Sequence, residues 1–264
     1  MLEKFLEHQI RLDEYITGNR LIQACEGSKA IFCKTDYLKD FCQNDIQTFV
    51  THNSDYPIND QRYVKGPKCA KWYAQNKDVE KDNVFSLPIG LENMKLYVSP
   101  LSKGGKYSSE VDRAFEKAIL IDKLNSLMLD KDNFAYMNFN INTYASERRK
   151  VWNKFKEEQW VTTANNVTLY KFYYDLATHK FAFSPRGNGI DCHRTWEALY
   201  LRTVPIIKES IHMNNFRDLP IYFIKNWDEV CYDRLKSFYE ERIVQEDFSL
   251  EKMKISYWND QFKS

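Results

Sequence analysis

The chain has 264 residues, of which 43% are hydrophobic and 28% are charged, so it can bury the core of one large domain or of two small ones. Its formal net charge of +1 argues against binding to nucleic acid or to a membrane surface through broad electrostatic attraction. No apolar run is long enough to span a bilayer, and the charged N-terminus lacks the apolar core of a signal peptide. The six cysteines show neither a C-x-x-C pair nor zinc spacing, which favours free thiols in a reducing compartment. We therefore expect a cytoplasmic protein that binds any anionic ligand through local arginines.

Short apolar segments separated by polar loops predict a first α/β domain over residues 1–104. Amphipathic helices are expected within residues 1–27, and a short helix over 36–42. The expected strands are 30–34, 47–52, 69–75 and 84–89. The second of these strands ends at His52, so the polar residues that follow, up to Asp55, lie in a loop of the kind where α/β proteins carry their chemistry.

A stretch rich in serine and glycine, residues 99–110, has the composition of a linker, and we place the domain boundary between 104 and 105. The second domain is predicted over residues 105–245, and residues 246–264 are expected to form a C-terminal helix that packs back on the first domain. The expected helices are 111–129, 145–159, 167–177, 193–202 and 210–216, and residues 228–260 are expected to be mostly charged helix. The expected strands are 134–139, 180–183, 204–207 and 219–224.

The most informative pattern lies between the strands 180–183 and 204–207. The first strand leads into the loop sequence SPRGNG, in which Gly187 and Gly189 would let backbone pass close to a ligand. Asp191 is the expected N-cap of the following helix. Strand, glycine loop, helix and strand make the βαβ unit of a parallel sheet, and ligands bind at the carboxyl ends of such strands.

The charged residues of this unit suggest a nucleotide. Arg186, Arg194 and a helix N-terminus would face one crevice and form an anion site. Glu197 lies one turn beyond Arg194, where its carboxylate could accept both hydroxyls of a ribose. Two simpler interpretations remain possible. Arg194 and Glu197 could form an ordinary surface ion pair, and the N-cap role alone would explain Asp191.

These residues carry a resemblance. The run R-G-x-G-x-D-x-x-R-x-W-E-A-L, followed by V-P-I-I, resembles the donor-binding segment of exostosin-like glycosyltransferases, and above all the short viral and bacterial members. Segments 50–55, 71–76 and 87–93 recur in the same order in those enzymes, and the resemblance covers roughly residues 30 to 230. A weaker likeness to α1,3-fucosyltransferases rests on the Val-Pro after the helix, but their acidic donor motif is not present.

The resemblance implies an α/β fold of two facing Rossmann-like domains, the compact GT-B arrangement. It also implies an inverting transfer of a hexose or pentose, without metal or other cofactor, from a UDP- or GDP-linked sugar to a glycan hydroxyl. The implied donor-binding residues are Arg186, Gly187, Gly189, Asp191, Arg194 and Glu197. Animal exostosins have a membrane anchor in the Golgi, whereas this sequence predicts the cytoplasm, which would be the host's if the protein is viral.

Inverting transfer needs a general base near the acceptor hydroxyl, and the candidates are Asp55, His52 and Glu92. The loop at Asp55 could equally be a plain turn, and Glu92 an exposed residue at the start of a segment. Asp130 and Asp132 form the D-x-D pattern of metal-dependent transferases, but their charged surroundings favour a solvated surface.

Two other classes remain. A non-catalytic nucleotide- or glycan-binding module would keep the same pocket without turnover. A dinucleotide oxidoreductase is less favoured, because its glycine motif would come early in the chain and include a third glycine.

Overall fold

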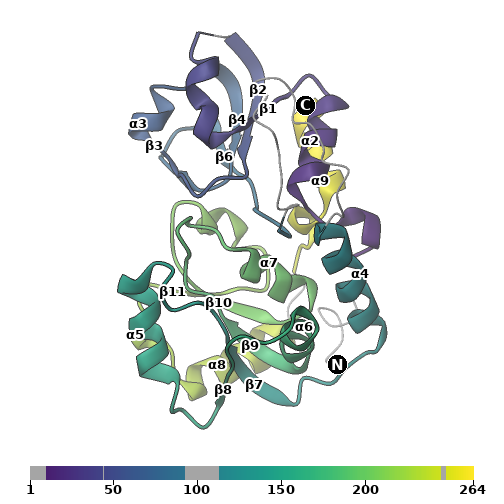
Figure 1. Cartoon of the computed structure of the whole chain (residues 1–264), viewed down its shortest axis with the longest axis vertical. Helices are drawn as coiled ribbons and strands as arrows, with labels where there is room; N and C mark the ends of the chain where they lie inside the picture. The colour runs from purple at the N-terminus through teal and green to yellow at the C-terminus, as the bar shows by residue number, and fades with distance from the viewer. Residues whose placement is uncertain (1–9, 44, 93–112, 245–247) are drawn as a thin grey trace.

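The chain forms a mixed α/β structure with two larger sheets, in which all described strands pair in parallel (Figure 1). The computed structural model describes residues 10–43, 45–92, 113–244 and 248–264. The first sheet has the order β1-β2-β4-β6, with β1 Ile31–Lys34, β2 Asp45–His52, β4 Lys68–Ala74 and β6 Val84–Ser86. The second has the order β11-β10-β9-β7-β8, with β7 Asn133–Met137, β8 Val161–Thr163, β9 His179–Phe183, β10 Val204–Lys208 and β11 Tyr222–Ile224. The predicted α/β class with parallel sheets is thus confirmed.

Helices connect the strands of both sheets. Before and within the first sheet lie η1 Leu12–Glu14, α2 Gly18–Glu26, η2 Thr35–Phe41 and α3 Asp60–Tyr63, together with the small parallel pair β3 Ile58–Asn59 and β5 Lys77–Asp78. Around the second sheet lie α4 Arg113–Ser126, α5 Ala145–Phe155, α6 Leu169–Thr178, α7 His193–Tyr200, η3 Met213–Phe216 and η4 Trp227–Glu229. The chain continues with α8 Tyr232–Phe238, η5 Tyr239–Ile243, η6 Glu251–Met253 and α9 Ile255–Lys263.

The expected strands are present, whereas β3, β5 and β8 were not predicted, and several elements differ at their ends. The strand expected over 84–89 ends at Ser86; Leu87 N still donates to the Ala74 carbonyl of β4, and Leu91 N donates to the Ile16 carbonyl. The helix expected over 193–202 ends at Tyr200, and Arg202 has a left-handed backbone conformation (φ 58°). The helix expected over 210–216 is only the short turn η3.

Residues 228–260 are mostly helical, as expected, but they do not form a single helix. In the described part of this segment α8 continues directly into η5, and η6 and the start of α9 follow as further pieces. Lys254, at the end of η6, adopts extended backbone and forms a bridge with Tyr15. Charge periodicity could not reveal this pairing, which joins residues far apart in the sequence.

The cores explain why the apolar runs form these sheets. One cluster on the first sheet is built from aromatic contacts, with the rings of Phe41 and Trp72 each packing on Phe49 at 5.4 and 5.3 Å. The larger cluster covers the second sheet and continues into α2 and the segment around Leu91. Trp196 of α7 is fully buried in this cluster. Burying one side chain of this size contributes about 2–3 kcal/mol.

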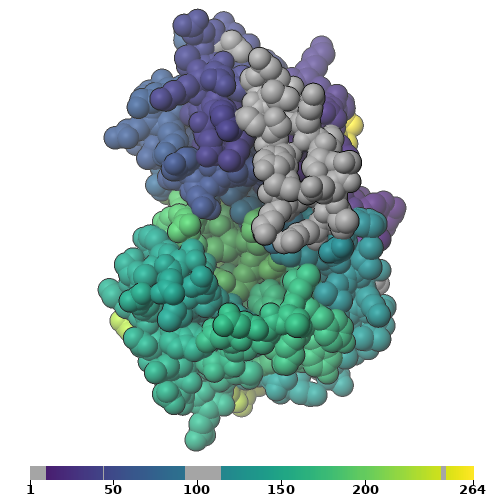
Figure 2. Space-filling view, in the orientation of Figure 1, coloured from purple at the N-terminus to yellow at the C-terminus, as the bar shows by residue number. Residues whose placement is uncertain are grey.

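Long-range contacts join the two sheets. In Figure 1 the C-terminal α9 runs beside α2, and the two helices are in contact. Tyr73 of β4 packs on Phe262 at 5.1 Å, and its hydroxyl donates to the Gln261 carbonyl. The Tyr200 hydroxyl accepts from Ile16 N and donates to the Met253 carbonyl. In the space-filling view, yellow C-terminal residues accordingly show beside the purple and blue part of the molecule (Figure 2).

The predicted linker over 99–110 and the domain boundary between 104 and 105 lie outside the described residues. The division into domains therefore stays a prediction. Within the described ranges, no helix combines the length and apolar character that crossing a membrane requires.

Candidate ligand-binding site

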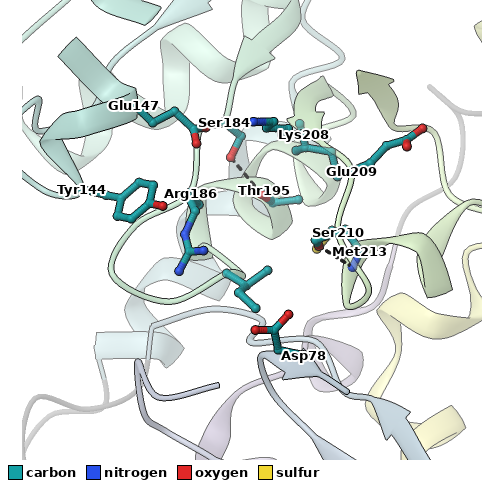
Figure 3. Close-up of a pocket in the computed structure, with 12 residues that line it drawn as sticks. Asp78, Tyr144, Glu147, Ser184, Arg186, Thr195, Lys208, Glu209, Ser210 and Met213 are labelled. Atoms are coloured by element: carbon teal, nitrogen blue, oxygen red, sulfur yellow. Dashed lines mark hydrogen bonds between the residues drawn. The ribbon is translucent and has the colours of Figure 1, made fainter. Parts of the chain in front are cut away.

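A cavity of about 220 Å³ opens at the carboxyl ends of β9 and β10 (Figure 3). Arg186 projects from the loop after β9 beside Tyr144, while Asp78 reaches toward the cavity from the opposite side, at the end of β5. The guanidinium of Arg186 lies over the Tyr144 ring at 4.4 Å and donates to the Asn188 carbonyl. No carboxylate of the described residues forms an ion pair with Arg186, so its charge is available to a ligand. The remaining lining residues are Glu147, Ser184, Ile190, Thr195, Ile207, Lys208, Glu209, Ser210 and Met213.

Two further arginines hold the same loop from its other side. Arg148 of α5 donates from Nε to the Arg186 carbonyl at 2.8 Å, and Arg194 of α7 donates to the Pro185 carbonyl at 2.8 Å. Their guanidiniums lie 5.6 and 5.3 Å from the ring centre of Phe139. We call Arg148 and Arg194 the arginine pair. Among the described residues, neither has a carboxylate within 4 Å, and the buried Nε of Arg194 has no hydrogen-bond partner.

The electrostatics of the arginine pair are unfavourable without a ligand. The pKa of Arg194 is lowered to about 10, chiefly by burial and also by the neighbouring charge of Arg148, against the opposing effects of Cys192 and Glu197. Arg148 is buried and Arg194 half-buried, and two such cations without an acid partner cost desolvation energy that an anion would offset. The pair also lies at the start of α7, where the helix dipole favours negative charge. This arrangement is suited to a phosphate or diphosphate.

Glu197 is buried (5% exposed), and its partners do not include Arg194, with which the sequence allowed an ion pair. Its Oε1 accepts from Lys117 Nζ and from the Tyr173 hydroxyl, each at 2.8 Å. Burial raises the pKa of the Glu197 carboxyl, but the charge and hydrogen bond of Lys117 outweigh it, so the pKa lies below its usual range. The surface ion pair with Arg194 is therefore not formed, and Glu197 is a buried carboxylate on the same helix as Arg194.

The N-cap role predicted for Asp191 is wrong. Cys192 is the N-cap of α7, and no side chain accepts a capping hydrogen bond there. The Asp191 carboxylate instead accepts from Ile89 N at 2.8 Å and from Trp196 Nε1 at 2.8–2.9 Å, and it lies 3.4 Å from His212 Nε2. A backbone N–H buried between the two sheets needs an acceptor, and Asp191 supplies it. Asp191 therefore connects the segment after β6 to α7.

The two loop glycines are explained by packing. A Cβ on Gly189 would come within 2.9 Å of Asn76 Nδ2, and one on Gly187 within 3.3 Å of Arg148 Nη2. Asn76 also accepts from Asp191 N at 2.8 Å. The glycines thus allow the close approach of Asn76 and of Arg148, which are groups of the protein itself, whereas the glycine pattern predicts the approach of a ligand.

The three candidate bases have very different surroundings. His52 is fully buried, its Nε2 donates to the Pro88 carbonyl, and burial lowers its pKa to about 4. Glu92 pairs with Lys117 at 3.0 Å. Asp55 is exposed, and its Oδ2 accepts from Asn188 Nδ2 at 3.4 Å. Of the three, Asp55 contacts the loop that carries Arg186.

The structure thus brings Arg194 and Glu197 together with residues that the sequence did not indicate. Arg148, Lys117 and Tyr173 come from the amphipathic helices α5, α4 and α6, where charged and aromatic residues are ordinary. No local motif marks them, so only the tertiary packing identifies them. Arg186 lies apart, at the cavity beside Tyr144.

Asp130 and Asp132 are exposed on either side of Lys131, whose buried ammonium donates to the Leu201 carbonyl and to Thr203 Oγ1. In the part of the chain that the structure describes, no three His, Cys, Asp or Glu side chains are grouped so as to hold a metal ion.

No protein-family model matches the chain, and no curated protein matches it. Any assignment of function therefore depends on the residues and their geometry.

Proposed function

We propose that the protein is a glycosyltransferase that moves a sugar from a UDP- or GDP-linked donor to a glycan hydroxyl, with inversion and without a metal ion. In this proposal the two parallel sheets belong to two facing Rossmann-like domains, and the enzyme acts in the cytoplasm. The observation that carries the proposal is the arginine pair: the guanidiniums of the buried Arg148 and the half-buried Arg194, at a helix N-terminus and without an acid partner among the described residues.

The arginine pair would bind the donor diphosphate. In an inverting transfer the acceptor oxygen attacks the anomeric carbon, the bond from that carbon to the phosphate oxygen breaks, and the nucleoside diphosphate leaves with the electron pair. Negative charge therefore grows on the phosphate as the reaction proceeds. Fixed guanidiniums stabilise such charge in a water-poor site, which is the task that a metal ion has in other transferases.

Glu197 would bind the ribose. Both hydrogen bonds that it accepts in the structure go to Oε1, so Oε2 is the oxygen that a ribose hydroxyl would use. Lys117 and Tyr173 fix the orientation of the carboxylate, and Lys117 keeps it ionised. One helical turn separates Glu197 from Arg194, which suits the separation of a ribose from its phosphates.

Asp55 is the base that we propose. It is exposed and contacts the loop after β9, so an acceptor hydroxyl beside it would lie next to the donor loop. His52 would have to break its hydrogen bond to the Pro88 carbonyl and leave a fully buried position to reach a hydroxyl. Glu92 pairs with Lys117, which also pairs with Glu197, so Glu92 lies near the carboxylate that we propose for the ribose.

The direct test is a thermal-shift screen of the full chain against UDP-, GDP- and CMP-sugars, carried out in EDTA. A ligand at about 100 times its Kd stabilises the folded state by about 2.7 kcal/mol, which raises the midpoint of a protein of this size by about 5 °C. We expect one nucleotide class to give this shift and to support transfer in EDTA. Failure of all three classes to shift the midpoint would overturn the proposal, and transfer that requires added Mn²⁺ would overturn the metal-independent part.

The ribose assignment predicts the effect of Glu197→Gln. We expect this variant to bind the nucleoside diphosphate about tenfold more weakly, because a neutral amide makes a poorer acceptor for hydroxyls than a carboxylate does. The 2′-deoxy analogue should lose less affinity on this substitution, since it lacks one of the two hydroxyls that Glu197 would accept. Calorimetric titrations would measure both, with the exposed neighbour variant Glu116→Gln on α4 as control. Equal losses for ribose and deoxyribose ligands would contradict the assignment.

A further inference from the structure

A second cavity, of about 230 Å³, lies in the first half of the chain between η2 and α3, at the carboxyl end of β1. It is lined by Thr35, Asp36, Leu38, Lys39, Tyr56, Gln61, Arg62 and Lys65. None of these residues belongs to the donor site proposed above. We call it the η2–α3 cavity.

The charges around the η2–α3 cavity are not balanced. Lys39, Arg62 and Lys65 contribute three cations, and Asp36 is the only carboxylate among the lining residues. Asp36 already pairs with Lys34 at 3.5 Å. In the described ranges, none of the three cations has a carboxylate within 4 Å. The cavity therefore favours an anionic ligand.

Its other walls suit a ligand rich in hydroxyl groups. The hydroxyl of Thr35 is buried and has no hydrogen-bond partner among the described residues, although the residue lines the cavity and is only 3% exposed. Tyr56 is 50% exposed, with Arg62 over one side of its ring at 4.5 Å. A buried polar atom without a partner is costly, and a ligand hydroxyl would satisfy it. Exposed aromatic surface packs well on the apolar faces of a sugar ring.

We infer that the η2–α3 cavity binds a sugar that carries a carboxylate or a phosphate, and that this sugar is part of the acceptor. Only one part of this inference, that the bound sugar belongs to the acceptor, rests on the proposed transferase function. Tyr56, which lines the cavity, directly follows Asp55 in the chain, and Asp55 contacts the loop after β9. A sugar bound against Tyr56 is thus next to the proposed base, and its anionic group faces Lys39 and Lys65.

Saturation-transfer NMR on the full chain tests the inference with three probes that share one ring: glucuronate, glucose 6-phosphate and glucose. We expect at least one anionic probe to bind in about the millimolar range and glucose to bind at least tenfold more weakly, since charge-assisted hydrogen bonds supply the difference. The probe that binds distinguishes a carboxylate from a phosphate ligand. Equal binding of glucose, or binding of none of the three, would overturn the inference.

The double variant Lys39→Gln/Lys65→Gln locates the binding. Both lysines are exposed, so the fold should be unaffected, and we expect affinity for the anionic probe to fall about tenfold. The matched control is Lys29→Gln/Lys68→Gln, which removes two exposed lysines near the amino ends of β1 and β4 and should bind as the wild type does. If both double variants lose affinity equally, the effect is one of net charge and the assigned cavity is wrong.

A saturating nucleoside diphosphate separates this inference from the proposed function. It should leave binding of the anionic sugar unchanged, because the two ligands occupy different sites. Displacement of the sugar would show that the probe binds at the donor site and would overturn the inference. Sugar binding that depends on Lys39 and Lys65 in a protein that binds no nucleotide-sugar would instead leave the cavity assignment intact and refute the transferase.

Discussion

Replacing Arg194 by glutamine is expected to weaken nucleotide-sugar binding about thirtyfold, yet to leave the thermal midpoint of the ligand-free protein unchanged or raised. The loss corresponds to about 2 kcal/mol, the usual contribution of a charge-assisted hydrogen bond to a phosphate in a buried site. A residue that only stabilises the fold would show the opposite pattern. The prediction therefore separates a ligand-binding arginine from a structural one.

The expected stability follows from the surroundings of Arg194. Its pKa is lowered to about 10, first by burial and then by Arg148, so the folded state disfavours the charged form relative to the unfolded chain. For a base whose pKa is lowered on folding, this cost is present at neutral pH and is relieved only as the pH rises above the lowered pKa. Glutamine removes the charge and the repulsion, and the Pro185 carbonyl that Arg194 contacts keeps a donor in Arg148.

Arg202→Gln is a matched control. Arg202 is also buried, its pKa is also lowered by burial, and its Nε lacks a hydrogen-bond partner among the described residues. It lies after α7, at the opposite end of the helix from Arg194. Affinity should be normal in this variant. The assignment of Arg194 fails if Arg194→Gln lowers the midpoint by several degrees while binding the donor normally.

The parallel sheets could be predicted because buried parallel strands are continuous apolar runs, and these runs are visible in the sequence. The alternation of such runs with helical segments indicated the βαβ unit around β9, α7 and β10. What could not be predicted were the partners of the charged residues. The pairing of Glu197 with Lys117 joins residues 80 positions apart, and no local pattern encodes it.

Asp191 shows how a long-range contact overrides a local preference. An aspartate just before a helix is a good N-cap, which contributes about 1 kcal/mol. At this position the carboxylate can instead satisfy the buried N–H of Ile89 and the indole N–H of Trp196, and an unsatisfied buried donor costs as much or more. A sequence pattern shows only the local preference. It therefore identified Asp191 as an important residue but predicted the wrong role for it.

The same reasoning applies to Gly187 and Gly189. A glycine-rich loop before a helix predicts a close approach of backbone, and that much is observed. The approaching groups are side chains of the protein itself, Arg148 and Asn76. The sequence indicates that space is needed, but it does not say which atoms use it.

Asp55→Asn is expected to lower the rate of sugar transfer about a hundredfold or more, with donor affinity almost unchanged. Asparagine has the shape of aspartate, and its side-chain oxygen can still accept from Asn188, so the contact between the two loops should persist. What it cannot do is take the proton of the acceptor hydroxyl. The loss should therefore appear in kcat, measured at saturating donor, while calorimetry shows a normal Kd for the nucleoside diphosphate.

Two further variants make the result specific. Asp60→Asn removes another carboxylate from the same half of the chain, in the first turn of α3, and should transfer at the wild-type rate. His52→Gln should lower stability, because it disturbs a fully buried side chain that is bonded to the Pro88 carbonyl. If Asp55→Asn transfers normally and His52→Gln is folded but inactive, the base is His52. That outcome would require the fully buried His52 to give up its contact with Asn53 Oδ1 when the acceptor binds, because Nδ1 is the ring nitrogen that does not donate to Pro88 and could accept the proton.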